Sequence, residues 1–246
     1  MTLPENLGRF VGALWSPAVR LGATLRHARL LHPEGITFRA ELSALDTHAS
    51  LQALAVHLPG PALVRLSTAL WRGHREWPDV LGVAVRLRST EAVTEEPSAG
   101  DQDLLFATLR SPWTLGLAPL TTDIHDWLKN DYYAVSPFQV EGLGRVKLRL
   151  VSHAEEVPGQ SRVEKLQAAV QAGRARFTFE ARPLRGELAG RWHPLAELRL
   201  AEEVSLDPAR LRFWPFRTGR GITPVGFIHS LRIPTYRQSQ KARAPH

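Results

Sequence analysis

Residues 64–87 read VRLSTALWRGHREWPDVLGVAVRL, and this stretch holds two apolar runs on either side of a polar one. The runs belong to PALVRLSTAL (61–70) and VLGVAVRLRS (80–89), whose Val and Leu residues are typical of β-strands. The segment between them, RGHREWPD, carries Gly, Pro and charged residues that favour a turn. The stretch therefore predicts two strands with a turn-rich connection.

Strand patterns recur along the rest of the chain. Apolar and polar residues alternate in GITFRAELSAL (35–45), GRVKLRLVSH (144–153), RFTFEARPL (176–184) and HPLAELRLAEEVSLDPARL (193–211). In the second of these, Val146, Leu148 and Leu150 fall on one face of a strand with period two. Many short strands with few helices predict an α+β fold, in which an antiparallel sheet or β-barrel carries flanking helices.

Three segments have helical patterns. SRVEKLQAAVQAGRA (161–175) is the clearest, because Ser161 and Glu164 form a capping box at its start. Residues 8–27 have a loose apolar stripe interrupted by Pro17, which predicts a packing helix, with a basic amphipathic membrane helix as the alternative. SLQALAVHL (50–58) predicts a helix or a further strand.

The acidic segment STEAVTEEPSAGDQD (89–103) is rich in turn formers and predicts an exposed loop. Strand-like sequence continues on both sides of it, so we expect no domain boundary there. No repeat of fixed period occurs. We expect one domain over residues 1–246.

Composition narrows the function classes. The chain has 246 residues, 43% of them hydrophobic, and no Cys, which excludes disulfides, thiolate nucleophiles and iron–sulfur clusters. The formal charge of +7 comes mainly from Arg scattered without a basic cluster, so we expect no nucleic-acid partner. With no long apolar run and no signal-peptide pattern at the start, we expect a cytoplasmic protein that does not bind a membrane.

The common catalytic motifs are missing from the sequence. No G-x-S-x-G, H-E-x-x-H or Walker loop occurs, and the glycine cluster TGRGITPVG (218–226) has the wrong spacing for a dinucleotide-binding loop. The ten His residues form no paired ligand motif beside a carboxylate. Motif rules alone therefore indicate only a β-rich domain.

Three segments, in order along the chain, resemble the haem catalases. ARLLHPEGITF (28–38) resembles their distal-histidine segment, and residues 64–87 resemble the following Arg-apolar-Ser-Thr strand with its Asp-x-x-Gly-x-Ala-Val. Arg232-Ile-Pro-Thr-Tyr236 resembles their proximal Arg-x-x-x-Tyr motif, with Arg243 seven residues later. The resemblance implies a minimal catalase-like barrel that binds haem b, with a C-terminal helix that carries the proximal ligand.

On the proximal side, the resemblance assigns Tyr236 as the iron ligand. A Tyr binds ferric haem as phenolate, and a neighbouring guanidinium, here Arg232, favours loss of the proton from a phenol whose ordinary pKa is ~10. Pro234 lies between the two residues and opposes an uninterrupted helix. We therefore expect the helix to begin at Pro234, with Tyr236 in its first turn.

On the distal side, His32 matches the family's acid–base group, which moves a proton from one peroxide oxygen to the other. Ser67 matches the serine that would orient His32 through a hydrogen bond. Arginines at three positions match those that pair with the haem propionates. These are Arg29, Arg65 and Arg243.

The chain departs from the catalases where they carry a distal Asn after an Asp-Leu pair. Here the run is Asp103-Leu-Leu-Phe106-Ala107-Thr108, so only Thr108, in a register shifted by one, supplies a hydrogen-bonding group. Because the chain is far shorter than a full catalase, we expect it to lack the family's threading arm, wrapping segment and C-terminal helical region. These departures favour peroxidase over catalase turnover.

The resemblance leaves several functions open. The expected substrates are a peroxide and an unidentified organic electron donor, handled by a monomer or small homo-oligomer. A non-enzymatic haem carrier or sensor is one alternative. A fatty-acid hydroperoxide isomerase of the allene-oxide-synthase type is another, ranked lower because Leu31 precedes the distal His where that branch carries Thr. A haem-free basic binding module comes last.

Overall fold

The computed structural model describes residues 34–69, 75–110, 118–134, 136–153 and 156–225. The helix predicted over residues 8–27 and the predicted C-terminal helix that carries Tyr236 lie outside these ranges. The strands are β1 (Gly35–Ala44), β2 (Gly60–Thr68), β3 (Leu81–Leu87), β4 (Gln102–Ala107), β5 (Tyr132–Ala134), β6 (Phe138–Val140), β7 (Gly144–Ser152), β8 (Arg176–Pro183), β9 (His193–Glu203) and β10 (Thr223–Pro224). The helices are η1 (Ala49–Leu51), α2 (Gln52–Ala55), α3 (Ala118–Thr121), η3 (Trp127–Lys129) and α4 (Arg162–Gln171).

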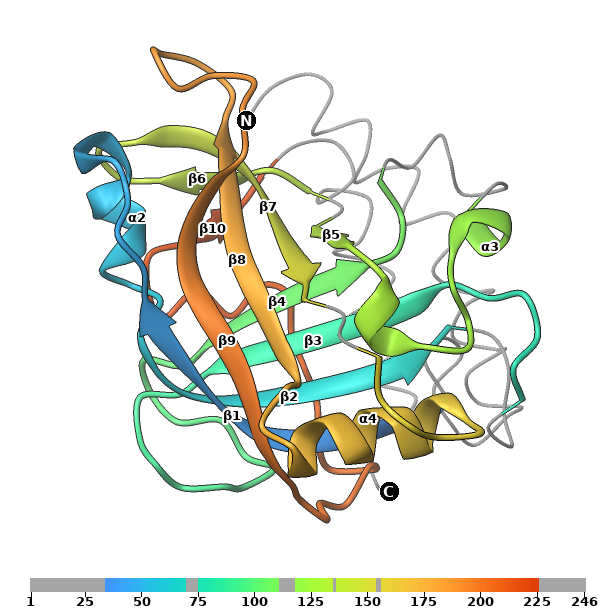
Figure 1. Cartoon of the computed structure of the whole chain (residues 1–246). Coiled ribbons are helices and arrows are strands. Elements are labelled where there is room, and N and C mark those ends of the chain that lie inside the picture. Colours follow the sequence, from blue (N-terminus) through green and yellow to red (C-terminus); the bar gives the residue numbers. More distant parts are fainter. Residues whose placement is uncertain (1–33, 70–74, 111–117, 135, 154–155, 226–246) are drawn as a thin grey trace, which may run out of the picture.

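Eight antiparallel strands close into a barrel (Figure 1). Around the barrel the order is β1-β2-β3-β4-β5-β7-β8-β9, and β9 pairs again with β1. The pairing of β7 with β8 is the one that joins the two ends of the sheet. The short strands β6 and β10 extend the edge of β7 beyond β5. The antiparallel barrel predicted from the alternating strands is confirmed.

The barrel lumen is filled by the apolar residues at every second strand position. On β7 these are Val146, Leu148 and Leu150, all fully buried, as the alternation predicts. Two edge-to-face aromatic pairs meet across the lumen, Phe106 with Phe179 and Tyr132 with Phe177. Burial of apolar surface at ~25 cal/mol per Å² is the main stabilising term for such a core.

The helices lie on the outside of the barrel. Helix α4 packs beside β9 (Figure 1) and buries Leu166 and Ala169 against the sheet. Ser161 caps its start by accepting a hydrogen bond from the Glu164 amide at 3.3 Å, and the Glu164 carboxylate accepts from the Gln160 amide at 2.9 Å. The predicted cap at Ser161 is confirmed. The Glu164 carboxylate, however, accepts from the amide of Gln160 and not from that of Ser161. Residues 50–58 form short helical turns rather than a strand.

The prediction of an exposed loop over residues 89–103 is wrong for its last three residues. Residues 89–100 are turns and bends with mainly exposed side chains, but the last three, Asp101, Gln102 and Asp103, are almost fully buried. Gln102 and Asp103 begin strand β4. Because these side chains are polar, the search for alternating apolar residues did not predict this part of the strand.

Among the described residues, the structure contains no helix that is both long and apolar enough to cross a bilayer.

Candidate functional site

A row of residues runs across the outer face of strands β1 to β5. Gly35 pairs with Ser67, Ser67 with Gly82, Gly82 with Ala107, and Ala107 with Tyr133. Residues directly opposite one another in an antiparallel pair have side chains on the same face, about 5 Å apart. Since neighbouring positions such as Leu66 and Phe106 belong to the lumen, the row lies on the outside.

Small side chains dominate this row. Gly82, in the middle, has no side chain, Ala107 on one side of it has a single methyl group, and Ser67 on the other side has a hydroxyl. Ser67 is 4% exposed. Ser67, Gly82 and Ala107 therefore form a strip of small residues across the outer face of β2, β3 and β4. The Ser67 hydroxyl lies at one edge of this strip.

Arg65 lies at the border of this strip, two residues from Ser67 on β2, and is 4% exposed. Its guanidinium lies over Gly35, where a Cβ atom would come within 2.8 Å of the guanidinium carbon. Gly35 therefore makes room for the Arg65 side chain. A buried guanidinium at this place could pair with a carboxylate on a bound group.

Thr108 is placed differently from its neighbour Ala107. Its hydroxyl accepts a hydrogen bond from the Leu81 amide at 3.1 Å and is hydrogen-bonded to the Thr122 hydroxyl at 2.8 Å. Thr122 in turn donates to the carbonyl of Ala118 in α3. Thr108 thus ties the end of β4 to β3 and to the residues just after α3, while Ala107 occupies the row position beside Gly82.

The opposite end of the same strands carries a charged network. Arg86 on β3 and Asp103 on β4 are paired in register, and Arg86 Nε lies 2.8 Å from Asp103 Oδ1, with both side chains fully buried. Asp103 Oδ2 also accepts from the Trp214 amide at 2.7 Å and from Arg217 at 3.2 Å. Burial lowers the pKa of Arg217, but the neighbouring Asp103 opposes this and favours the charged form.

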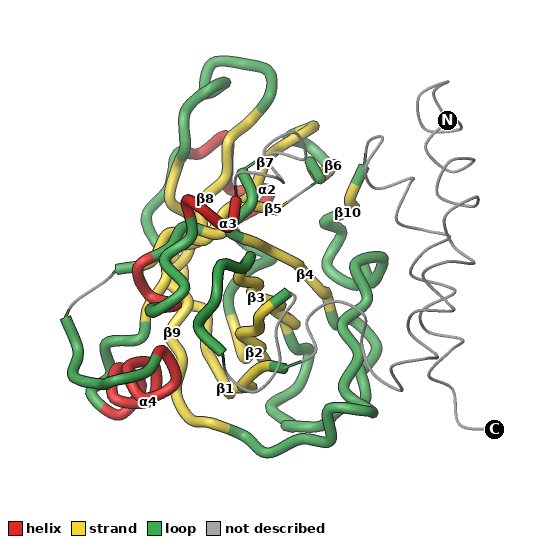
Figure 2. The backbone as a smooth tube through the Cα atoms, turned by 90° about the vertical axis from the view of Figure 1, so that its right-hand side faces the viewer, coloured by secondary structure: helices red, strands yellow, loops and turns green. Residues whose placement is uncertain are grey.

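This network fastens the segment after β9 to the barrel. Residues 204–222 run from the end of β9 to β10 (Figure 2). Gln102 donates to the carbonyls of Arg217 and Ile222, at 2.8 and 3.1 Å. Below it, Leu211 and Phe213 pack on Leu63 of β2. The segment thereby covers one end of the outer face of β2, β3 and β4.

A second polar cluster joins the residues before β3 to the start of α4. One carboxylate oxygen of Glu76 accepts from the Arg162 amide at 2.7 Å, and the other lies 2.5 Å from Nδ1 of His125. Burial acts to raise the pKa of Glu76, but these hydrogen bonds outweigh it, so the pKa is lowered from its ordinary value. Arg162 donates to the carbonyls of Ile124 and Arg75. The cluster thus links the residues before β3 to α4, although the buried Nε of Arg162 has no hydrogen-bond partner among the described residues.

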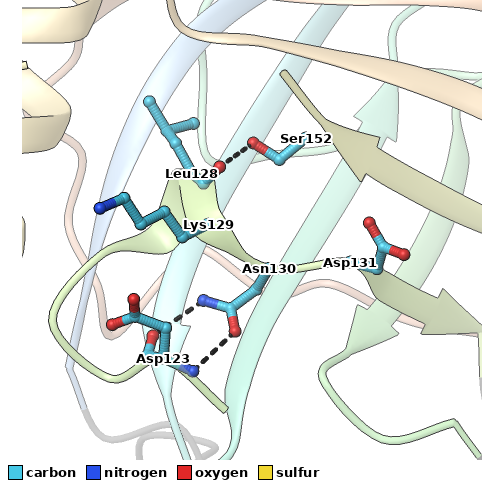
Figure 3. A pocket seen from close by; sticks show the side chains of 6 residues that line it. All are labelled: Asp123, Leu128, Lys129, Asn130, Asp131 and Ser152. Atoms are coloured by element: carbon cyan, nitrogen blue, oxygen red, sulfur yellow. Dashed lines mark hydrogen bonds between the residues drawn. The ribbon is translucent and has the colours of Figure 1, made fainter. Parts of the chain in front are cut away.

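A pocket of about 480 Å³ lies beside η3 and the ends of β5 and β7 (Figure 3). Its lining residues are Asp123, Leu128, Lys129, Asn130, Asp131 and Ser152. The Asn130 amide group bonds the backbone of Asp123 in both directions, and Ser152 donates to the Leu128 carbonyl. The pocket's amide and hydroxyl groups are thus committed to the fold. Among the described residues, His, Asp and Glu side chains form no cluster able to hold a metal ion.

The site residues expected from the sequence fall into two groups. Arg65, Ser67 and Thr108 lie within the described residues, and the structure brings Arg65 and Ser67 together on one face while Thr108 serves the end of β4. The others lie outside the described ranges, so their roles stay predictions. They are Arg29, His32, Arg232, Tyr236 and Arg243.

The described residues fit a planar group such as haem in two respects. The strip of Ser67, Gly82 and Ala107 has no bulky side chain of its own, and Arg65 places a buried guanidinium at its border. Tyr133 was not expected as part of this face. The alternation of side chains along a strand could have indicated it. Tyr132 is fully buried in the lumen, so the next residue, Tyr133, lies on the outer face.

Comparison with known proteins supports the fold alone. No family model matches the chain, and none of the curated proteins matches it. Among solved structures, the chain is similar to the crystal structure of a fungal catalase, with a TM-score of 0.60 and 13% sequence identity. The match covers 91% of this chain and 62% of the catalase chain, so this chain spans less than two thirds of that protein. The chain therefore has a catalase-like fold.

Proposed function

We propose that this protein is a haem-dependent peroxidase that cleaves the O–O bond of hydrogen peroxide or an organic hydroperoxide and oxidises an organic donor. One observation carries the proposal: on a barrel of catalase-like fold, Ser67, Gly82 and Ala107 lie in register on one outer face beside the buried Arg65. By the resemblance to catalases, Ser67 stands at the position of the distal serine, Ala107 at that of the distal Asn, and Arg65 at that of a propionate partner.

The chain's own residues have separate tasks in this proposal. Tyr236 holds the haem iron, and Arg232 stabilises its phenolate form. Arg29, Arg65 and Arg243 hold the propionates through charge-assisted hydrogen bonds. When bound, haem b supplies a redox-active iron.

His32 and Ser67 act on the peroxide side. His32 takes the proton from one peroxide oxygen and returns it to the other, so that water leaves. Ser67 holds the imidazole in position. Ala107 offers no hydrogen bond at the place where catalases carry Asn, which favours oxidation of a donor over release of oxygen from a second peroxide molecule.

The test uses full-length protein produced with ample haem. We expect Tyr236→Phe to lose most haem or change its absorption spectrum, because the iron loses its ligand. His32→Ala should keep the haem load and the spectrum while peroxide-driven oxidation of a donor falls by ~10²-fold or more.

Two results would contradict the proposal. Unchanged haem content and spectrum in Tyr236→Phe would remove the ligand assignment. Bound haem with no reaction towards any peroxide would favour the carrier or sensor function instead. As a control, Glu141→Gln changes an exposed side chain between β6 and β7 and should alter neither property.

A further inference from the structure

A cluster of aromatic and cationic side chains lies on the outer face of the barrel, directly beside the strip described above. Tyr133 on β5 is the register partner of Ala107 on one side and of Arg149 on the other. Trp192, immediately before β9, meets Tyr133 edge to face with 6.2 Å between the ring centroids. Both rings are half-exposed.

Three arginines stack on these two rings. The guanidinium carbons of Arg149 and Arg182 lie 4.5 and 4.9 Å from the Trp192 ring centroid. Arg110, an exposed residue, lies 5.7 Å above the Tyr133 ring. Stacking restrains a guanidinium while its N–H donors stay available in the plane of the group.

The charges in this cluster do not cancel. Arg149 is paired with Glu180 at 2.6 Å and with Asp131 at 3.7 Å. Burial acts to lower the pKa of Arg149, but the hydrogen bond and charge of Glu180, together with Tyr133, outweigh it and raise the pKa, so this guanidinium remains charged and paired with Glu180. Among the described residues, Arg110 and Arg182 form no ion pair. The cluster therefore presents two oriented cations next to two half-exposed rings.

We propose that Arg110, Tyr133, Arg182 and Trp192 form a binding site for a small anionic aromatic molecule, such as an aromatic carboxylate. The two free guanidiniums supply the planar donors that suit a carboxylate. The rings supply apolar surface for an aromatic body. Tyr133 lies on β5 and Arg182 on β8, with β7 between them, so the cluster extends over about 10 Å at a strand spacing of ~4.8 Å, which suits one small molecule.

The position of the cluster links it to the proposed function. Tyr133 lies one strand from Ala107 and three strands from Ser67, which is about 14 Å at a strand spacing of ~4.8 Å. If the protein is a peroxidase, the ligand of this site is its electron donor. Binding itself does not rest on the proposed function, because no described member of the cluster belongs to the peroxide side.

The test measures binding of 4-hydroxybenzoate to the full-length protein by calorimetry, without peroxide. We expect saturable binding that weakens by about tenfold or more in Arg182→Gln, the loss expected from one charge-assisted hydrogen bond. Trp192→Leu should weaken binding as well. Arg185→Gln is the matched control, because Arg185 is an exposed arginine after β8 that stacks on no ring of the described residues. This variant should bind as the natural protein does.

Cyclohexanecarboxylate tests the aromatic part of the proposal. We expect it to bind more weakly than 4-hydroxybenzoate in the natural protein, with the difference reduced in Trp192→Leu. Equal binding of the two acids would reduce the cluster to a simple anion site and overturn the proposal. Absent binding, equal binding in Arg182→Gln, or binding only of an acidic polypeptide would overturn it too.

A kinetic measurement separates this inference from the proposed function. With 4-hydroxybenzoate as donor, Arg182→Gln should raise KM with little change in kcat, because the variant removes a binding contact far from the peroxide side. Saturable binding without peroxide-driven oxidation would leave the site standing and remove the proposed function. Peroxidase turnover with an unchanged KM in Arg182→Gln would support the proposed function and contradict the binding site.

Discussion

The outer face of β2, β3 and β4 has two ends that differ sharply. At one end, Arg86 and Asp103 are fully buried and bonded to each other and to residues 212–217. At the other end, the same three strands present Ser67, Gly82 and Ala107. The first end binds the segment after β9 to the barrel, and the second end carries only small side chains.

The difference shows how charge is used in this barrel. A buried ion pair is stable only when its remaining donors and acceptors are also satisfied. The Arg86–Asp103 pair meets this condition through the carbonyls of Glu95 and Arg212 and the amide of Trp214. That end is therefore committed to structure. The small residues of the other end make no such demand, which leaves this end suited to binding.

The largest expected effect is on the charged end. Asp103→Ala should lower the free energy of unfolding by about 3–5 kcal/mol, because Arg86 is then buried without its partner. Urea unfolding followed by circular dichroism measures this loss.

Glu91→Gln is the matched control for Asp103→Ala. Glu91 pairs with Arg39 at 3.5 Å, but both side chains are largely exposed. Its loss should change stability by less than about 1 kcal/mol. Equal effects of the two substitutions would contradict the difference drawn between buried and exposed pairs.

An intermediate effect is expected at the end that carries Ser67, Gly82 and Ala107. Ala107→Asn should raise the ratio of oxygen release to donor oxidation by about tenfold, equivalent to one hydrogen bond of ~1.4 kcal/mol in the transition state. Oxygen-electrode and donor-oxidation rates on the haem-loaded protein give this ratio.

Thr108→Val provides the comparison for Ala107→Asn. It removes the hydroxyl that accepts from the Leu81 amide and is hydrogen-bonded to Thr122, so we expect it to cost stability without changing the ratio. A changed ratio in Thr108→Val, with none in Ala107→Asn, would assign the distal position to Thr108 instead.

The smallest expected effect concerns acid stability through Glu76. Because the pKa of Glu76 is lowered in the folded protein, its ionised form contributes stability above the unfolded value of ~4.3, and this contribution is lost as the pH falls through the lower folded value. Glu76→Gln should therefore be less stable at neutral pH, by about 1 kcal/mol or less, and should lose less stability on acidification. Thermal unfolding at pH 7 and pH 3.5 tests this, and a parallel decline in both proteins would contradict it.

Local patterns in the sequence predicted the longer elements of this fold. Alternation predicted β1, β7, β8 and β9, since side chains of a strand alternate between lumen and surface whatever strand lies beside it. Runs of Val and Leu predicted β2 and β3. The cap at Ser161 could also be predicted from local sequence, because its partner, Glu164, is three residues away. Strand β4 was partly missed, because Gln102 and Asp103 are polar residues buried by segments far away in the chain.

The sequence by itself therefore determined the strands, the clearest helix and, through a resemblance, the residues to examine in a haem site. Only the tertiary structure decided that β7 pairs with β8 to close the barrel, that Ala107 rather than Thr108 joins the row with Ser67, and that Tyr133 meets Trp192. The physical reason is that register and closure depend on contacts between residues distant in sequence. A shift of one residue in register, which local patterns do not report, moves every side chain to the opposite face.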